Sequence, residues 1–191
     1  MRSLPEYPPD IQLYCTPASY TTVTGSVAKL HGESGYLLSF QPCRPKSRGR
    51  IITEINDAMQ APAIYPESLS KADDCKAVLR GARLVQKLIS TDALKNVTIG
   101  SFDKDVQKMN DDEILDDFKA RASTVFHPCC TCRMGNDEKD SVLNSEMKLH
   151  GVKNLRVVDA SAFPNITSGN TNAPTIMLAH RAANFILNDY R

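Results

Sequence analysis

The sequence lacks the features that define several broad classes of protein. It has no run of eighteen apolar residues, and its first residues, MRSLPEYPPD, hold no uninterrupted apolar stretch, so we expect neither a membrane span nor a signal peptide. Its 23 basic and 22 acidic residues leave a formal net charge of +1, which argues against nucleic acid or an anionic membrane as a partner. Six cysteines are too few for a disulfide scaffold in 191 residues.

What is present is the composition of a globular protein that mixes strands and helices. With 41% hydrophobic and 24% charged residues, the chain can bury a core. Alternation and apolar runs predict strands at 10–15, 35–42 and 49–55, and we expect the last two to share one sheet across the intervening CRPKSR turn. A further short buried strand is predicted around 155–158.

Two helices are marked by capping residues in the first two thirds of the chain. Ser70 and Asp73 form a capping-box pattern ahead of apolar residues at helical spacing, which predicts a helix over 72–89. Asn110 and Glu113 repeat that pattern before DDEILDDFKARAST, whose acidic start and basic end complement the helix dipole.

A third helix is predicted at the carboxyl end, over 173–190. Asn172 is expected to cap it, and Pro174 is acceptable in its first turn. The apolar residues that the spacing places on one face are Ile176, Ala179, Ala183 and Ile186.

The stretch VFHPCCTCRMG, 125–135, crowds a histidine and three cysteines together. His127, Cys129, Cys130 and Cys132 could hold zinc, but adjacent cysteines are poorly placed to share one ion and no second ligand pair follows. The CxxC spacing could indicate a redox site, but no helix opens there. The third interpretation is that the cysteines are small packing residues beside one important histidine. The adjacent pair favours a reducing compartment.

Three motifs in sequence order resemble one family. HPCCTCRMG, LHGVKNLRVVDASAFP and TSGNTNAPTIMLAHRAANFI are similar to the carboxyl-terminal part of the glucose-methanol-choline (GMC) oxidoreductases, FAD-dependent alcohol oxidases and dehydrogenases, with choline dehydrogenase-like members closest. Upstream, RPKSRGRI resembles the family's Arg-Pro-x-Ser-Arg-Gly element. The resemblance implies an α+β fold: residues 1–125 as a partial substrate-binding domain with an antiparallel or mixed sheet and flanking helices, and 126–191 as the segment that completes the FAD domain.

The resemblance also implies a catalytic pair. His127 would handle the proton of the substrate hydroxyl, and Asn170 would stand opposite it. Chemistry agrees with this, because removing hydride from an alcohol carbon requires the hydroxyl proton to leave, and an imidazole can accept it near neutral pH. Flavin N5 would take the hydride, since no side chain performs that redox step.

The flavin contacts implied by the resemblance lie in two turns. Asp159 and Ala160 match the family's contact with the phosphate and ribityl region, and Asn172, Ala173 and Pro174 match the turn against the isoalloxazine ring. A helix that begins there can stabilise negative charge on reduced flavin through its free N–H groups.

Two departures from the family pattern stand out. The family often places Val-Gly where this chain has Cys129 and Cys130, and glycine takes φ angles that cysteine resists. The amino-terminal GxGxxG turn that holds the FAD pyrophosphate is not in this sequence. We therefore expect the chain to need a separate FAD-binding half and to be inactive alone. The alternatives are a flavin-less binding module and a small zinc protein that uses the histidine and cysteine cluster.

Overall fold

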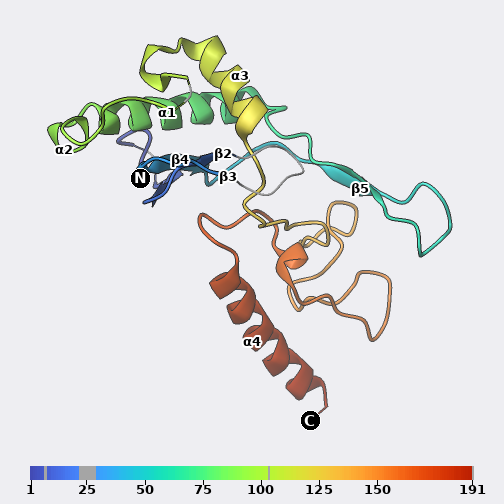
Figure 1. The fold of residues 1–191 in the computed structure, drawn as a ribbon. Coiled ribbons are helices and arrows are strands. Elements are labelled where there is room, and N and C mark those ends of the chain that lie inside the picture. The colour runs from blue at the N-terminus through green and yellow to red at the C-terminus, as the bar shows by residue number, and fades with distance from the viewer. Residues whose placement is uncertain (7, 22–28, 103, 191) are drawn as a thin grey trace. The chain divides into compact units, whose positions relative to one another are not determined.

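The protein has an α+β fold built from small antiparallel sheets and four α-helices (Figure 1). The computed structural model describes residues 1–6, 8–21, 29–102 and 104–190. Within these ranges, no helix is long and apolar enough to cross a membrane.

The chain divides into two compact units, and each combines two separate stretches of sequence. Unit 1 consists of Met1–Ser47 and Leu69–Ser123, and unit 2 consists of Arg48–Ser68 and Thr124–Arg191. This division cuts the chain close to the expected boundary after residue 125, but it also assigns 48–68 to the carboxyl-terminal unit. The roles expected for the two domains stay predictions.

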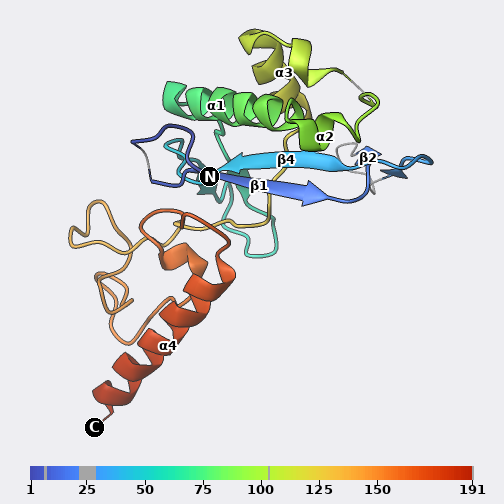
Figure 2. The ribbon, with the colours of Figure 1, turned by 90° about the vertical axis from the view of Figure 1, so that its left-hand side faces the viewer.

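Unit 1 is a two-stranded sheet covered by helices. β1 (Ile11–Thr16) pairs antiparallel with β4 (Leu37–Pro42) over their whole lengths, so both predicted strands are confirmed. A second pair, β2 (Tyr20–Thr21) with β3 (Lys29–Leu30), is shorter. Figure 2 shows α1 lying along β4, and a Cβ added at Gly81 of that helix would meet the Phe40 ring at 2.3 Å. The sheet and the helix are therefore in close contact.

The expectation that 35–42 and 49–55 share one sheet is wrong. β5 (Arg50–Ile52) belongs to unit 2 and pairs with β6 (Ala63–Tyr65) instead. The intervening segment is not a hairpin turn, because the Asp74 carboxylate accepts hydrogen bonds from the Lys46 and Ser47 amides at 2.7 and 2.8 Å. Those bonds hold the chain against α1 as it leaves β4.

α1 spans Ala72–Ile89, the bounds that the sequence predicts. Its buried face includes Val78, Ala82 and Val85. The predicted capping box is wrong, because the N-cap is Lys71 and its side chain makes no capping hydrogen bond. The acidic residue in this turn that does bind amides is Asp74, and it binds those of the preceding loop rather than those of its own helix. Short elements α2 (Asp92–Lys95) and η1 (Val106–Lys108) follow.

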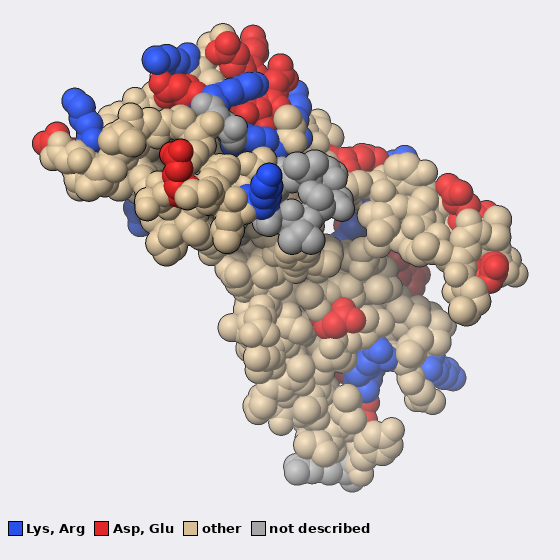
Figure 3. Space-filling model, viewed as in Figure 1, with Lys and Arg blue, Asp and Glu red and all other residues tan. Residues whose placement is uncertain are grey.

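α3 spans Asp111–Arg121 and begins with the predicted capping box. Asn110 Oδ1 accepts from the Glu113 amide at 3.0 Å, and Glu113 Oε2 accepts from the Asn110 amide at 2.8 Å. Ile114 faces the core of unit 1 with Ala82 and Met109. Figure 3 shows charged side chains of both signs gathered over this helix, so it presents no field of a single sign.

Unit 2 has a core formed by the carboxyl-terminal helix and the loops before it. α4 spans Asn172–Asp189, and the turn η2 spans Ala160–Ala162. The predicted buried strand around 155–158 is wrong: Arg156 forms an isolated bridge with Lys148 and belongs to no strand, and Leu155 is 47% exposed. The buried core residues are Leu143, Met147, Ala162, Phe163, Leu178 and Ala182.

The residues of α4 that enter this core are not those that the spacing groups on one face. Leu178 and Ala182 are buried, whereas Ile176 is 63% exposed and Ile186 38% exposed. The reason is that Leu178 and Ala182, at one flank of a broad apolar face, pack against Leu143, and the core of unit 2 does not extend to the other flank.

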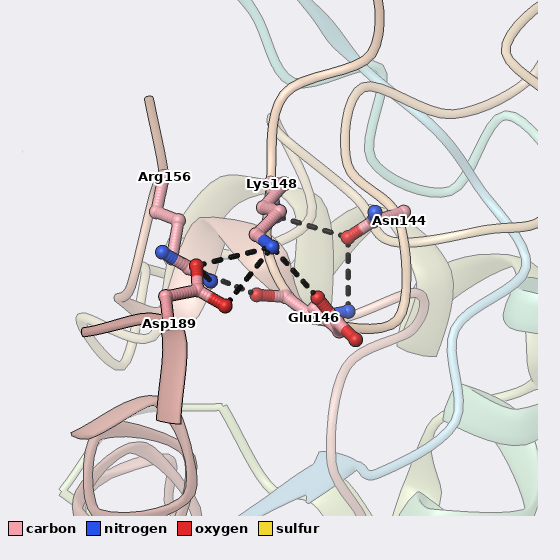
Figure 4. A network of polar contacts seen from close by, with 5 residues as sticks. All are labelled: Asn144, Glu146, Lys148, Arg156 and Asp189. Atoms are coloured by element: carbon pink, nitrogen blue, oxygen red, sulfur yellow. Dashed lines mark hydrogen bonds and ion pairs between the residues drawn. The ribbon is translucent and has the colours of Figure 1, made fainter. Parts of the chain in front are cut away.

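A polar network fixes the carboxyl end of α4 (Figure 4). Asp189 binds Arg156 at 2.8 Å and Lys148 at 3.1 Å, and Lys148 also binds Glu146 at 3.0 Å. The hydrogen bonds from Arg156 and Lys148 lower the pKa of the Asp189 carboxyl. Asn144 Oδ1 accepts from the Glu146 and Lys148 amides and so shapes the loop that carries them. The carboxyl end of α4 is thereby tied to the loops of unit 2 that carry Lys148 and Arg156.

Candidate functional site

The loop that carries His127 is joined to the start of α4 by a side-chain hydrogen bond. His127 is half-buried, and its Nδ1 lies 3.0 Å from Oγ1 of Thr171. Thr171 is buried and is the N-cap residue of α4. Residues 44 positions apart are therefore brought together, and one ring nitrogen of the histidine is fixed.

Backbone hydrogen bonds hold the same loop against η2. The amides of Cys130, Cys132 and Met134 donate to the carbonyls of 160, 161 and 162 at 3.3, 3.0 and 3.0 Å. Asp159 Oδ1 accepts from the Ser161 amide at 2.7 Å and so caps the turn. Asp159 is exposed and Ala160 half-buried, so both remain accessible beside the histidine loop.

The first turn of α4 differs from the prediction in one detail. Asn172 is the first helical residue rather than the cap, because the Thr171 carbonyl already accepts from the Thr175 amide at 2.9 Å. No side chain caps the helix, since the Thr171 hydroxyl faces His127 instead. Asn172 and Ala173 are exposed and Pro174 is half-buried. Their turn therefore presents the positive end of an 18-residue helix.

Asn170 is exposed and directly precedes the residue that binds His127. The structure thus brings the Asn170 segment and the His127 loop to one helix start, while the roles assigned to the two side chains stay predictions. Sequence reasoning missed Thr171. Its signal was its position between two asparagines in SGNTNAP, where a hydroxyl next to a helix start normally caps that helix.

The three clustered cysteines are free thiols that pack against the core of unit 2. The Sγ atoms of Cys129 and Cys130 lie within hydrogen-bonding distance, 3.3 Å apart. Burial, followed by the hydrogen bond with Cys130 and the negative charge of the Cys130 thiolate, raises the pKa of Cys129 to about 12, against a lowering by Arg48. Zinc requires thiolates, and no group of three or more His, Cys, Asp or Glu residues in the described part of the chain could hold a metal. The zinc interpretation thus gains no support from the geometry.

The Arg-Pro-x-Ser-Arg-Gly element also reaches this unit. Arg48 donates to the Asn165 side chain, in the loop before α4. Next to it, a Cβ added at Gly49 would lie 2.3 Å from the Tyr65 carbonyl oxygen, so the chain can pass β6 this closely only with glycine. The motif therefore connects the β5–β6 hairpin to the segment that leads into the helix start.

Comparisons with known proteins identify a family that this chain matches. The sequence profile of the GMC oxidoreductase family matches residues 45–179. An alcohol dehydrogenase (acceptor) of Pseudomonas putida is 39% identical over 153 residues, which is 80% of this chain and 28% of the relative. An oxygen-dependent choline dehydrogenase of Pseudomonas fluorescens is 33% identical over 187 residues, which is 97% of this chain and 32% of the relative.

The fold is also found in a solved structure. The crystal structure of pyridoxine 4-oxidase from Mesorbium loti superposes with a TM-score of 0.76 at 28% identity, covering 96% of this chain and 36% of that one. The chain thus spans about a third of the length of these relatives.

Proposed function

The chain belongs to the GMC oxidoreductase family, and we propose that it forms part of an FAD-dependent enzyme that oxidises an alcohol to an aldehyde or ketone. Two relatives are named as alcohol and choline dehydrogenases, which supports this reaction class. The observation that carries the proposal is the hydrogen bond between His127 and Thr171, because it places the imidazole at the start of α4.

His127 is the residue that moves the substrate proton. When Nδ1–H donates to Thr171 Oγ1, the lone pair lies on Nε2, which can accept the hydroxyl proton of an alcohol. The Thr171 hydroxyl fixes this tautomer and ring orientation, as second-layer groups do for catalytic histidines. The carboxamide of Asn170 holds the substrate oxygen without competing for the proton.

The residues at the helix start fit a flavin. Exposed Asn172 and Ala173 offer uncapped backbone amides at the positive end of α4, which suits an electron-rich ring that gains negative charge. Asp159 and Ala160 lie on the η2 turn that is hydrogen-bonded to the histidine loop. When bound, FAD supplies the hydride acceptor that no side chain can replace.

A further polypeptide part is needed to bind the rest of the cofactor. The relatives are about three times as long as this chain, and α4 exposes a second set of large apolar side chains. Such a face normally packs against another part of a protein. The residues are Ile176, Met177, Ile186 and Leu187.

The test is to reconstitute the missing part. The chain is purified alone and after co-expression with the amino-terminal portion of the choline dehydrogenase relative, and flavin absorbance and alcohol-dependent flavin reduction are measured. We expect the chain purified alone to carry no flavin. We expect the co-expressed complex to carry flavin and to reduce it when alcohol is added. A tightly held yellow cofactor in the chain alone would contradict the need for a second part.

Matched histidine variants separate catalysis from folding. His127→Gln should lower the rate of flavin reduction in the complex by about 10²- to 10⁴-fold, the usual contribution of a general base. His150→Gln is the control, because the His150 ring lies 3.1 Å from the Ser141 hydroxyl rather than beside the start of α4. Equal rates of flavin reduction in the two variants would show that His127 takes no part in the reaction. Flavin binding without any alcohol oxidation would favour the non-catalytic binding module.

A further inference from the structure

The adjacent thiols of Cys129 and Cys130 lie closer together than unbonded sulfurs usually do. Their Sγ atoms are 3.3 Å apart, and forming a disulfide bond of about 2.05 Å requires a shift of little more than an ångström. The backbone at Cys130 and just after it is held in place, since the Cys130 and Cys132 amides donate to the 160–161 carbonyls. The proximity is thus built into the loop.

We propose that Cys129 and Cys130 are a redox-active pair that a small disulfide, such as oxidised glutathione, converts to a vicinal disulfide. A Cys130 thiolate attacks one sulfur of the oxidant, the S–S bond of the oxidant breaks, and one glutathione leaves as its thiolate. Cys129 then attacks Cys130 Sγ and releases the second glutathione. Two protein S–H bonds are lost, one S–S bond forms, and the two electrons and two protons are recovered in two glutathione molecules.

The order of attack follows from the surroundings of the two thiols. The raised pKa of Cys129 makes it a poor first nucleophile, and besides burial its causes are the hydrogen bond and charge of Cys130. Once Cys130 is in a mixed disulfide, both of those contributions from its thiol are gone. Burial, the largest cause, remains and is opposed by the charge of Arg48, so the pKa of Cys129 is raised less than in the dithiol. The first step therefore activates the residue that completes the second.

The resulting disulfide is expected to be strained and easily reduced. Neighbouring Cα atoms lie 3.8 Å apart, below the 4.4–6.8 Å usual in disulfides. Cys130 also has φ +72°, a left-handed conformation that already costs energy for a non-glycine residue. Strained disulfides have the more oxidising potentials typical of labile, regulatory pairs. Such a pair can cycle even where thiols are normally kept reduced.

The location makes the modification consequential for the histidine. Cys129 is two residues after His127, and moving its sulfur toward Cys130 changes the loop that positions the bond to Thr171. This consequence rests on the proposed function, whereas formation of the disulfide does not.

The experiment measures the disulfide directly, on the whole chain and without flavin or alcohol. The reduced protein is equilibrated in glutathione buffers of graded ratio, alkylated with iodoacetamide, and digested with trypsin. The peptide Ala122–Arg133 contains all three cysteines. We expect one alkyl group on Cys132, none on the adjacent pair, and a mass about 2 Da below that of the dithiol peptide carrying the same single label.

Matched variants identify the bond. Cys132→Ser should still form the disulfide, whereas Cys130→Gly, a residue suited to φ +72°, should leave Cys129 fully alkylated. Circular dichroism of each reduced variant verifies that it is folded. Three alkylated cysteines at every glutathione ratio, a bond that includes Cys132, or a stable glutathione adduct would each overturn the proposal. Failure of the proposed function would leave this readout unchanged.

Discussion

Replacing Cys130 with glycine and with alanine measures the backbone strain beside the candidate catalytic histidine. Both changes remove the same sulfur, so they differ only in the Cβ. At φ +72°, an alanine Cβ crowds the following carbonyl at a cost of about 1–2 kcal/mol, and glycine does not. Glycine loses about 0.4–1 kcal/mol through the extra entropy of the unfolded chain. We therefore expect Cys130→Gly to be more stable than Cys130→Ala by about 0.5–1 kcal/mol.

The control is the same pair of substitutions at Cys132, which is two residues away and outside the left-handed region. There alanine should be more stable than glycine by about 0.5–1 kcal/mol, because only the entropy difference remains. Subtracting the glycine–alanine stability difference at Cys132 from the one at Cys130 cancels the entropy contribution of the unfolded chain. The difference that remains is the strain alone, about 1–2 kcal/mol in favour of glycine at Cys130.

The assay is urea unfolding of the four variants in a reducing buffer, monitored by circular dichroism. For a chain of this size, 1 kcal/mol corresponds to about 2–4 °C in thermal midpoint, so heating provides a second measurement. If alanine is as stable as glycine at Cys130, or if the two sites give the same order, the loop is not held in the left-handed conformation. The explanation of why the family favours glycine here would then fail.

Three further predictions concern the hydrogen bonds made by individual residues, Asp74, Asn110 and Thr171. Asp74→Asn should destabilise the fold by about 2 kcal/mol, as expected for lost hydrogen bonds to a buried carboxylate, with exposed Asp73→Asn as the near-neutral control. Burial raises the pKa of Asp74, but the hydrogen bonds outweigh it and lower the pKa overall. This stability is therefore present above about pH 4 and is lost as the pH falls through the lowered folded pKa. Unfolding curves at a series of pH values should show a smaller loss in Asp74→Asn than in wild type. Asn110→Ala should cost about 1 kcal/mol through loss of the α3 cap, and Asp112→Ala, in the same turn, should cost clearly less in the same urea assay. Thr171→Val should cost about 1–2 kcal/mol and change the ring ¹⁵N shifts of His127, and unchanged shifts would show that the two side chains are not bonded in solution.

Local signals in the sequence were sufficient to predict α1 and α3 of unit 1, although not the short α2. The capping pair Asn110 and Glu113 satisfies the first amides of α3 from within one turn, so nothing distant is needed to fix that start. Strand partners depend on contacts far apart in sequence, and there the prediction failed: a turn-like segment after β4 is diverted by the Asp74 carboxylate, which no local pattern reveals. Thr171 was missed for the same reason, since its hydroxyl serves a histidine 44 residues away instead of its own helix.

The choice of buried residues in α4 has a physical explanation that bears on function. Its apolar residues form one broad face, with Leu178 and Ala182 toward one flank and Ile176 and Leu187 toward the other, so helical periodicity alone gives no reason to prefer either flank. Packing against Leu143 buries the first flank and leaves the second exposed. An apolar flank left exposed on a helix is a surface suited to packing against another part of a protein. Under the proposed function, this exposed flank is the surface against which an FAD-binding part would pack.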